Sequence, residues 1–322
     1  MTEKLLNSNY QTVQVGDRTL LVSAVVDLDG TSNNELEPER TRLQTVLPAK
    51  QAFSYLESIG IPVSIATARA VLEADVYAKE MDTHGGIIGE DGAALLLPEG
   101  ANIDYFQEQF TAISVGNRVA IALSSVTIKE LGQFIRNCEN LLGEELLPSC
   151  FTNPEVLSPF AGHFDPEFTR LSIARVACAY IANLSDRQAE LILQQITHWD
   201  LDHVWGSRDT PIVVKGKDAN KGTALQILND YPEVLTLGNR QIDGILPIVF
   251  GNSKNDLVMF EKAHQLGGIA VVVAHPDGGY FIPEEAIPNY VIKATRPYGE
   301  GIREVIPQVI SILQDRFQID VD

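Results

Sequence analysis

The sequence predicts an α/β protein whose mostly parallel sheet is interrupted by an inserted α+β domain. Strand-like apolar runs alternate with helical patterns over residues 20–97 and again over residues 211–313, which is typical of βαβ units. Residues 102–209 lose this alternation. We therefore expect one domain from residues 1–101 and 210–322 and a second from residues 102–209, in keeping with about 150 residues per domain in a chain of 322.

The first part of the chain contains two strand–helix pairs and then two short strands. Residues 20–26 form a continuous apolar run, as expected for a strand buried on both faces of a parallel sheet. Apolar residues at helical spacing, with Pro48 near the start and Gly60 at the end, predict the first helix. The expected elements are a strand at 20–26, a helix at 48–60, a strand at 61–66, a helix at 69–80 and short strands at 87–88 and 93–97.

The rest of the chain divides into an irregular middle and a second alternating part. In the middle we expect helices at 126–140 and 185–197 and strands at 175–181 and 203–206. The alternation then returns, with strands expected at 211–214, 246–250 and 269–274 and helices at 221–229, 256–266 and 300–313.

The charge balance narrows the possible partners. The chain has 24 basic and 43 acidic residues, a net charge of −19, which repels nucleic-acid backbones and anionic membranes. It has no apolar run of membrane-spanning length and no signal-like segment at its start. Three cysteines, Cys138, Cys150 and Cys178, argue against a disulfide framework. We expect a cytoplasmic protein that binds neither nucleic acid nor membranes.

Two carboxylates follow directly after the first buried strand. Asp27 and Asp29 stand at its end, and Gly30 allows the chain to turn sharply there. Ligands of open α/β sheets bind at the carboxyl ends of the strands. One carboxylate could attack a substrate and bind a metal while the other exchanges protons. The alternative interpretation is an ordinary aspartate-rich turn.

Three later segments also carry polar side chains to strand ends or helix starts. Thr67, Ala68 and Arg69 follow the second strand, Lys221 opens a helix, and the loop 251–256 follows a later strand. Together with the two aspartates they provide a nucleophile, a hydroxyl, an ammonium and a metal-binding loop. The alternatives are a solvated surface lysine at 221 and an ordinary strand end at 67.

This ordered set, together with the turn at 89–93, resembles the haloacid dehalogenase (HAD) superfamily of phosphatases, in the branch with a large α+β (C2-type) cap. The resemblance implies a Rossmann-like three-layer core with a parallel sheet, with the insertion as the cap. It implies that Asp27 takes the phosphoryl group and that Asp29 is the general acid and base. Thr67 would hydrogen-bond the phosphoryl oxygens, and Lys221 would neutralise their charge.

The resemblance also implies Mg²⁺ as the cofactor, with Asp27, Asp29, Asn252 and Asp256 as its ligands. Mg²⁺ is commonly held by one or two carboxylates and several waters. The family loop usually reads Gly-Asp, whereas this chain has Asn252, whose amide oxygen brings no charge. Either Asp256 supplies the missing carboxylate, or metal affinity and turnover are weakened.

The substrate side of the site is less specific in the sequence. Within the branch, the chain is most similar to mannosyl-3-phosphoglycerate phosphatases, through residues 169–181, the segment from residue 184 onward and the tail 294–304. Sucrose-phosphate phosphatases and Cof-type enzymes belong to the same branch. A substrate with a phosphate and a carboxylate calls for arginines in the cap. Phosphate- and substrate-binding residues are expected at Gly30, Thr31, Ala68, Arg69, Asn255, Arg170, Arg175 and Arg208.

The resulting hypothesis is a magnesium-dependent phosphatase that hydrolyses a small phosphorylated sugar-type metabolite through an aspartyl-phosphate at Asp27. The expected substrate is a glycosyl-3-phosphoglycerate, and the expected assembly is a monomer or homodimer. Three alternatives stay open. They are a sucrose-phosphate or generic sugar-phosphate phosphatase, a phosphomannomutase-like mutase, and a phospho-ligand-binding protein impaired in catalysis by Asn252.

Overall fold

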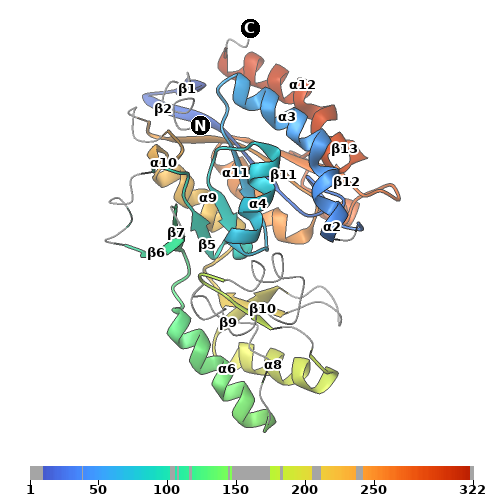
Figure 1. Ribbon diagram of the computed structural model, residues 1–322. Helices are drawn as coiled ribbons and strands as arrows, with labels where there is room; N and C mark the ends of the chain where they lie inside the picture. Colours follow the sequence, from blue (N-terminus) through green and yellow to red (C-terminus); the bar gives the residue numbers. More distant parts are fainter. Residues whose placement is uncertain are drawn as a thin grey trace.

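Two separate β-sheets organise the chain (Figure 1). The computed structural model describes residues 10–37, 39–101, 106, 109–115, 118–143, 146, 175–181, 184–204, 212–236 and 242–319. Among the helices in these ranges, none is long and apolar enough to cross a membrane. In Figure 1 the large sheet and its helices form the upper body, and the small sheet lies below with helices α6 and α8.

The large sheet has ten strands in the order β13-β12-β11-β2-β3-β4-β5-β7-β6, with β1 paired to β2 beside this path. Neighbours from β13 to β4 are parallel, and the other pairs are antiparallel. The strands are β1 Thr12–Val15, β2 Arg18–Asp27, β3 Val63–Ala66, β4 Ile87–Gly89, β5 Ala94–Leu96, β6 Thr111–Val115, β7 Arg118–Ala122, β11 Gly244–Gly251, β12 Ile269–Ala274 and β13 Ile292–Pro297. The predicted α/β class with a mostly parallel sheet is confirmed.

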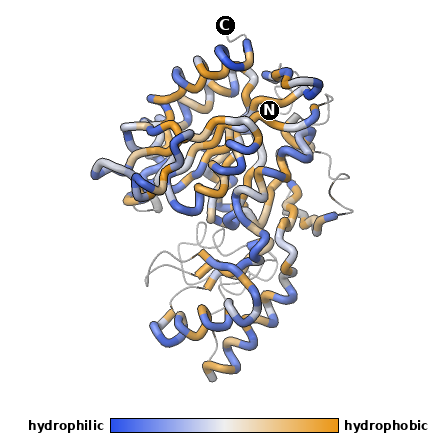
Figure 2. The backbone as a smooth tube through the Cα atoms, turned by 180° about the vertical axis from the view of Figure 1, so that it is seen from behind, coloured by the Kyte–Doolittle hydropathy of each residue, from blue (hydrophilic) through white to orange (hydrophobic). Residues whose placement is uncertain are grey.

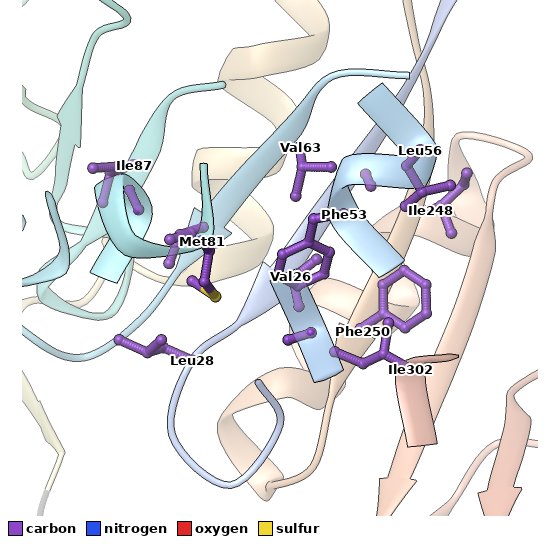
Figure 3. Packing of buried hydrophobic residues seen from close by; sticks show 14 of the residues in the cluster. Val26, Leu28, Phe53, Leu56, Val63, Met81, Ile87, Ile248, Phe250 and Ile302 are labelled. Carbon is purple, nitrogen blue, oxygen red and sulfur yellow. The ribbon is translucent and has the colours of Figure 1, made fainter. Parts of the chain in front are cut away.

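Helices cover both faces of this sheet, because successive side chains of a strand point to opposite sides. Along β2, Val22 and Val26 join a cluster with α3, α4 and α12, whereas Leu21 and Val25 join a second cluster with α9 and α11. Figure 3 shows Val26 packed near Phe53 of α3 in the first cluster. The helices are α2 Glu39–Arg42, α3 Leu47–Ser58, α4 Val71–Met81, α9 Lys221–Asp230, α10 Glu233–Thr236, α11 Leu257–Gln265 and α12 Tyr298–Phe317.

The hydropathy pattern agrees with this three-layer arrangement. In Figure 2 the hydrophobic colour runs along the central strands of the upper body, while the outer turns of the helices are largely hydrophilic. All eight residues of β11 and all six of β12 are buried. Their continuous apolar sequences are therefore those of strands covered on both faces.

The small sheet has three antiparallel strands in the order β8-β10-β9, namely Ala179–Ile181, Ile212–Gly216 and Leu201–Val204. Helices α6 Ile128–Leu142 and α8 Asp186–His198 pack on one of its faces through a third apolar cluster. Both helices begin with a capping box, formed by Thr127 with Glu130 and by Ser185 with Gln188. We call this body the cap.

The sheet pairings differ from the domain limits expected from the sequence. Strands β6 and β7 lie within 102–209 but extend the large sheet through β5, whereas β10 lies within 210–322 but is the middle strand of the cap. Ile212 and Val214 of β10 pack into the cluster under α6 and α8. Local apolar patterns do not specify which sheet a strand joins. We propose domain boundaries after β7 and after β10.

Candidate active site

Three adjacent parallel strands bring the predicted motifs to one edge of the large sheet. β2 lies between β3 and β11, with Asp27 opposite Ala66 and Val26 opposite Phe250. The residues that follow these strand ends are Thr67 on one side and the loop from Asn252 on the other. This edge is the usual ligand-binding position in open parallel sheets.

The centre of the site is a buried group of two carboxylates and one ammonium. Lys221 Nζ lies 2.6 Å from Asp27 Oδ1 and 2.6 Å from Asp256 Oδ1. Asp27 is 5% exposed, and both Lys221 and Asp256 are 0% exposed. Lys221 is the first residue of α9, whose start is capped by the Asn220 side chain, which accepts a hydrogen bond from the Thr223 backbone N–H. The helix start therefore holds the ammonium against both carboxylates.

The electrostatics of this group follow from its burial. Burial and the nearby Asp256 carboxylate raise the pKa of Asp27 to about 8, although Lys221 opposes the change. Burial alone would lower the pKa of Lys221, but the Asp256 and Asp27 carboxylates outweigh it and raise that pKa. Lys221 therefore stays charged, and the unpaired negative charge of the site is small.

The turn after Asp27 is built to hold this carboxylate. Thr31 Oγ1 donates a hydrogen bond of 2.9 Å to Asp27 Oδ2, and Ser32 Oγ donates one of 2.7 Å to the Asp27 carbonyl. Gly30 has a φ of +75°, and a Cβ at this position would clash with the Asn252 side chain. The glycine therefore permits both the left-handed turn and the close approach of the two loops.

Asp29 is paired with an arginine rather than with the central group. Arg69 binds it through two contacts, Nε to Oδ2 at 2.6 Å and Nη2 to Oδ1 at 2.8 Å, and also contacts Glu73. Burial alone would raise the pKa of Asp29, but Arg69 outweighs it and lowers that pKa. Thr67 is buried, and its hydroxyl accepts a hydrogen bond from the Arg69 backbone N–H. Arg69, expected at the phosphate, thus lies on Asp29.

In the loop after β11, the Asp256 carboxylate is fully hydrogen-bonded, whereas the Asn252 side-chain oxygen has no partner. Asp256 Oδ2 accepts hydrogen bonds from the backbone N–H groups of Asn252 and Ser253, both at 2.9 Å, so both of its carboxylate oxygens are engaged. Asn252 is 2% exposed, and its Oδ1 has no hydrogen-bond partner. A buried acceptor without a partner is costly, and a bound cation would satisfy it.

A divalent cation fits these residues, although without a cage of charged ligands. The described residues contain no group of three or more His, Cys, Asp or Glu arranged to hold a metal. The oxygens of Asp27 and Asn252 are nevertheless hard donors of the kind that Mg²⁺ accepts together with waters. Asp29 and Asp256, which the sequence also predicts as metal ligands, are paired with Arg69 and Lys221 in the structure, and their role at a metal stays a prediction.

Lys215, which the sequence analysis did not single out, connects the site to the cap through Asp91 of the predicted turn 89–93. Lys215 of β10 is 1% exposed, and its Nζ lies 2.7 Å from Asp91 Oδ2. Asn255 Nδ2 donates to the other oxygen of Asp91 at 3.3 Å. Asp91 therefore links a cap strand to the loop that carries Asn252. A lysine at the end of an otherwise apolar strand was the available signal.

Of the three cap arginines, only Arg175 lies within the described residues, and Arg170 and Arg208 lie outside them. Arg175 donates to the Ala68 carbonyl at 2.7 Å, and its guanidinium carbon lies 4.9 Å from the centre of the Tyr180 ring. Glu90 accepts hydrogen bonds from the backbone N–H groups of residues 176 and 177, at 2.6 and 2.8 Å. The cap thus rests on the loops after β3 and β4.

A mostly parallel sheet with charged side chains at its carboxyl edge, and a second body in contact with the loops at that edge, is an arrangement typical of α/β enzymes. A sequence model of the haloacid dehalogenase-like hydrolases matches residues 24–277, and the chain belongs to this family. The chain is therefore a hydrolase, and the resemblance predicted from its motifs is confirmed.

Similar proteins and solved structures agree with this family assignment. The chain is 26% identical over 247 residues to a mannosyl-3-phosphoglycerate phosphatase of Pyrococcus horikoshii, covering 76% of this chain and 90% of that protein. It is 24% identical over 234 residues to a glucosyl-3-phosphoglycerate/mannosyl-3-phosphoglycerate phosphatase of Methanococcoides burtonii, covering 72% and 79%. A haloacid dehalogenase-like hydrolase from Bacteroides thetaiotaomicron shares the fold, with a TM-score of 0.56, 13% identity and coverage of 89% and 99%.

Proposed function

We propose that the protein is a magnesium-dependent phosphatase that acts on a small phosphorylated sugar-type metabolite. The observation that carries this proposal is the buried group of Asp27, Lys221 and Asp256 at the carboxyl edge of the sheet. A carboxylate beside a fixed ammonium can attack phosphorus while the cation stabilises the charge on the phosphoryl oxygens.

In the first step, an Asp27 oxygen would form a bond to phosphorus as the bond from phosphorus to the sugar oxygen breaks. The leaving oxygen needs a proton, and Asp29 is the group placed two residues away to give it. Arg69 holds Asp29 ionised in the structure. We therefore propose that the substrate phosphate draws Arg69 away, after which Asp29 takes up a proton from solvent and donates it to the leaving oxygen. In the second step Asp29 would take a proton from the water that hydrolyses the aspartyl-phosphate.

Other groups would bind and orient the phosphoryl group. Lys221 would neutralise its oxygens, and the buried Thr67 hydroxyl would hydrogen-bond to them. Mg²⁺, held by Asp27 and by the unpartnered Asn252 oxygen, would supply the charge that offsets repulsion between the carboxylate and the phosphate. The other predicted phosphate-binding residues of the core lie in the loops that carry Asp27, Thr67 and Asn252, namely Gly30, Thr31, Ala68 and Asn255.

For the substrate we propose a glycosyl-3-phosphoglycerate, because the relatives are named for such compounds. A substrate of this kind carries a carboxylate, for which an arginine is a suitable partner. Arg175 of the cap contacts the Ala68 carbonyl in the loop after β3, and we propose it for this role. A second candidate is a phospho-ligand-binding protein with little turnover, which the uncharged Asn252 favours. A cytoplasmic location and a monomeric or dimeric state stay predictions.

The test is phosphate release from a panel of sugar phosphates and glycosyl phosphoglycerates, with MgCl₂ and with EDTA. We expect Mg²⁺-dependent release with one preferred substrate, and a loss of at least about a thousandfold for Asp27→Asn. Asp17→Asn, in the exposed turn between β1 and β2, is the matched control and should retain activity. Full activity of Asp27→Asn would overturn the mechanism. Isomerised sugar phosphate without phosphate release would indicate a mutase, and a folded but silent protein would favour the binding role.

A further inference from the structure

The loop after β11 carries the neutral Asn252 where the family has an aspartate, and the nearest carboxylates do not replace this charge. Asn252 is neutral, Asp256 is paired with Lys221, and Asp29 is paired with Arg69. Asp27 shares the same Lys221. The affinity of an oxygen site for a divalent cation rises with the charge of its ligands. A site of Asp27 and Asn252 alone would therefore bind Mg²⁺ weakly.

One further carboxylate lies beside this loop. Glu35 follows the turn after β2, and its Oε1 lies 3.0 Å from the position that a Cβ on Gly30 would take. The Asn252 amide nitrogen Nδ2 reaches the same position and would clash with that Cβ, while the amide oxygen Oδ1 is the other end of the same group. Glu35 and Asn252 therefore meet at Gly30, on the loop that follows the Asp27 strand.

The backbone around Glu35 is held in place. The Glu35 carbonyl accepts a hydrogen bond of 2.8 Å from Arg42, and the Asn34 backbone N–H donates one of 2.8 Å to Thr45 Oγ1. The Glu35 side chain is half-buried. The carboxylate is thus presented to Asn252 by a fixed loop.

The surroundings of the carboxylate are suited to a cation. Within the described ranges, no hydrogen bond or ion pair joins the Glu35 carboxylate to another residue. The oxygen at the other end of the Asn252 amide is buried without a hydrogen-bond partner, and this is the second sign that a positive ligand belongs beside this loop.

We propose that Glu35 supplies the carboxylate that Asn252 lacks, and that it reaches the divalent cation directly or through one water. This inference rests on the proposed magnesium dependence. It makes the metal site of this chain a set of Asp27, Asn252 and Glu35, with the charge moved from the loop after β11 to the loop after β2.

The test is direct titration of the metal-free full chain with MgCl₂ by calorimetry, without substrate. Glu35→Gln should weaken Mg²⁺ binding by about ten- to a hundredfold. The matched control is Glu37→Gln in the same loop, whose carboxylate accepts a hydrogen bond from Thr41 at 3.2 Å. The control should bind Mg²⁺ as the unaltered chain does.

A double variant separates a missing charge from a disturbed loop. Glu35→Gln combined with Asn252→Asp should recover Mg²⁺ affinity, because the charge returns at the neighbouring position. The melting temperature of metal-free Glu35→Gln should equal that of the unaltered chain, and only its increase with MgCl₂ should shrink.

The outcomes distinguish this inference from the proposed function. If the unaltered chain and Glu35→Gln bind Mg²⁺ equally, the role of Glu35 is wrong and the magnesium-dependent phosphatase stands. If Glu35→Gln loses affinity but the double variant does not recover it, Glu35 acts through loop structure and the inference also fails. If the unaltered chain binds no Mg²⁺, both the inference and the magnesium part of the proposed function are wrong.

Discussion

The edge of the large sheet and the cap are held together in different ways. At the edge, Asp27, Lys221 and Asp256 all come from the large-sheet body and are all buried. The cap has one face closed by α6 and α8, while Ala177 and Val213 on its other side belong to a cluster of the large-sheet body. The residues proposed for the chemistry are thus internal to one body. The cap depends for its position on its contact with the other.

A strained turn connects the two regions. Glu90, Asp91 and Gly92, the short helix η2, have φ values of +55°, +54° and +89°. A Cβ on Gly92 would clash with Asn220, directly before Lys221. The same turn binds the cap through Glu90 and Asp91. Left-handed non-glycine residues cost free energy and persist only where their surroundings hold them. We infer that this turn sets the cap and the start of α9 relative to each other.

The largest effect is expected from Lys221→Met. The variant leaves Asp27 and Asp256 facing each other without a cation in a buried place. Removing one partner of a buried ion pair destabilises a protein by about 3–5 kcal/mol, so we expect that loss together with loss of phosphate release. Urea unfolding and the phosphate assay measure the two effects. Lys217→Met, at an exposed lysine, is the control, and equal stability of the two variants would contradict the account.

A smaller and different effect is expected from Lys215→Met in the cap. This change removes the tie to Asp91 but leaves Asp27 and Lys221 in place. If the cap mainly binds substrate, KM should rise by roughly tenfold while kcat falls less. Steady-state kinetics on the preferred substrate decide the matter. A fall in kcat at unchanged KM would mean that the tie to Asp91 serves the reacting groups instead.

The smallest effect concerns two buried thiols and tests whether the cap opens. Burial and Glu139 raise the pKa of Cys138 to about 12, and burial with Glu90 raises that of Cys178. Both should therefore react slowly with a thiol reagent in the folded protein. Cys138 lies in the cap cluster and Cys178 in a cluster shared with the large-sheet body.

Opening of the cap should expose Cys178 and leave Cys138 covered. In a chain carrying Cys150→Ser, we expect Lys215→Met to speed the labelling of Cys178 severalfold and not that of Cys138. Peptide mass analysis after timed labelling identifies the thiol. Equal acceleration of both would indicate general unfolding, and no acceleration would show that Lys215 does not hold the cap.

Much of the site could be predicted from the sequence because its groups follow strand ends. Parallel strands in contact carry their carboxyl ends to one edge, so Asp27, Thr67 and Asn252 meet once the strands are recognised. The sequence did not predict which side chain each of these groups would pair with. Arg69 was expected at the phosphate but binds Asp29, and Asp256 was expected at the metal but binds Lys221.

The sequence by itself determined the α/β class, the order of the motifs and the family, because these depend on local periodicity and on short motifs. Only the tertiary structure decided that β10 belongs to the cap, that Lys215 binds Asp91 and that Glu35 lies beside Asn252. The physical reason is that burial and long-range pairing choose the partner of each charge. A buried charge takes the nearest opposite charge in space, and neighbours in space can be far apart in the sequence.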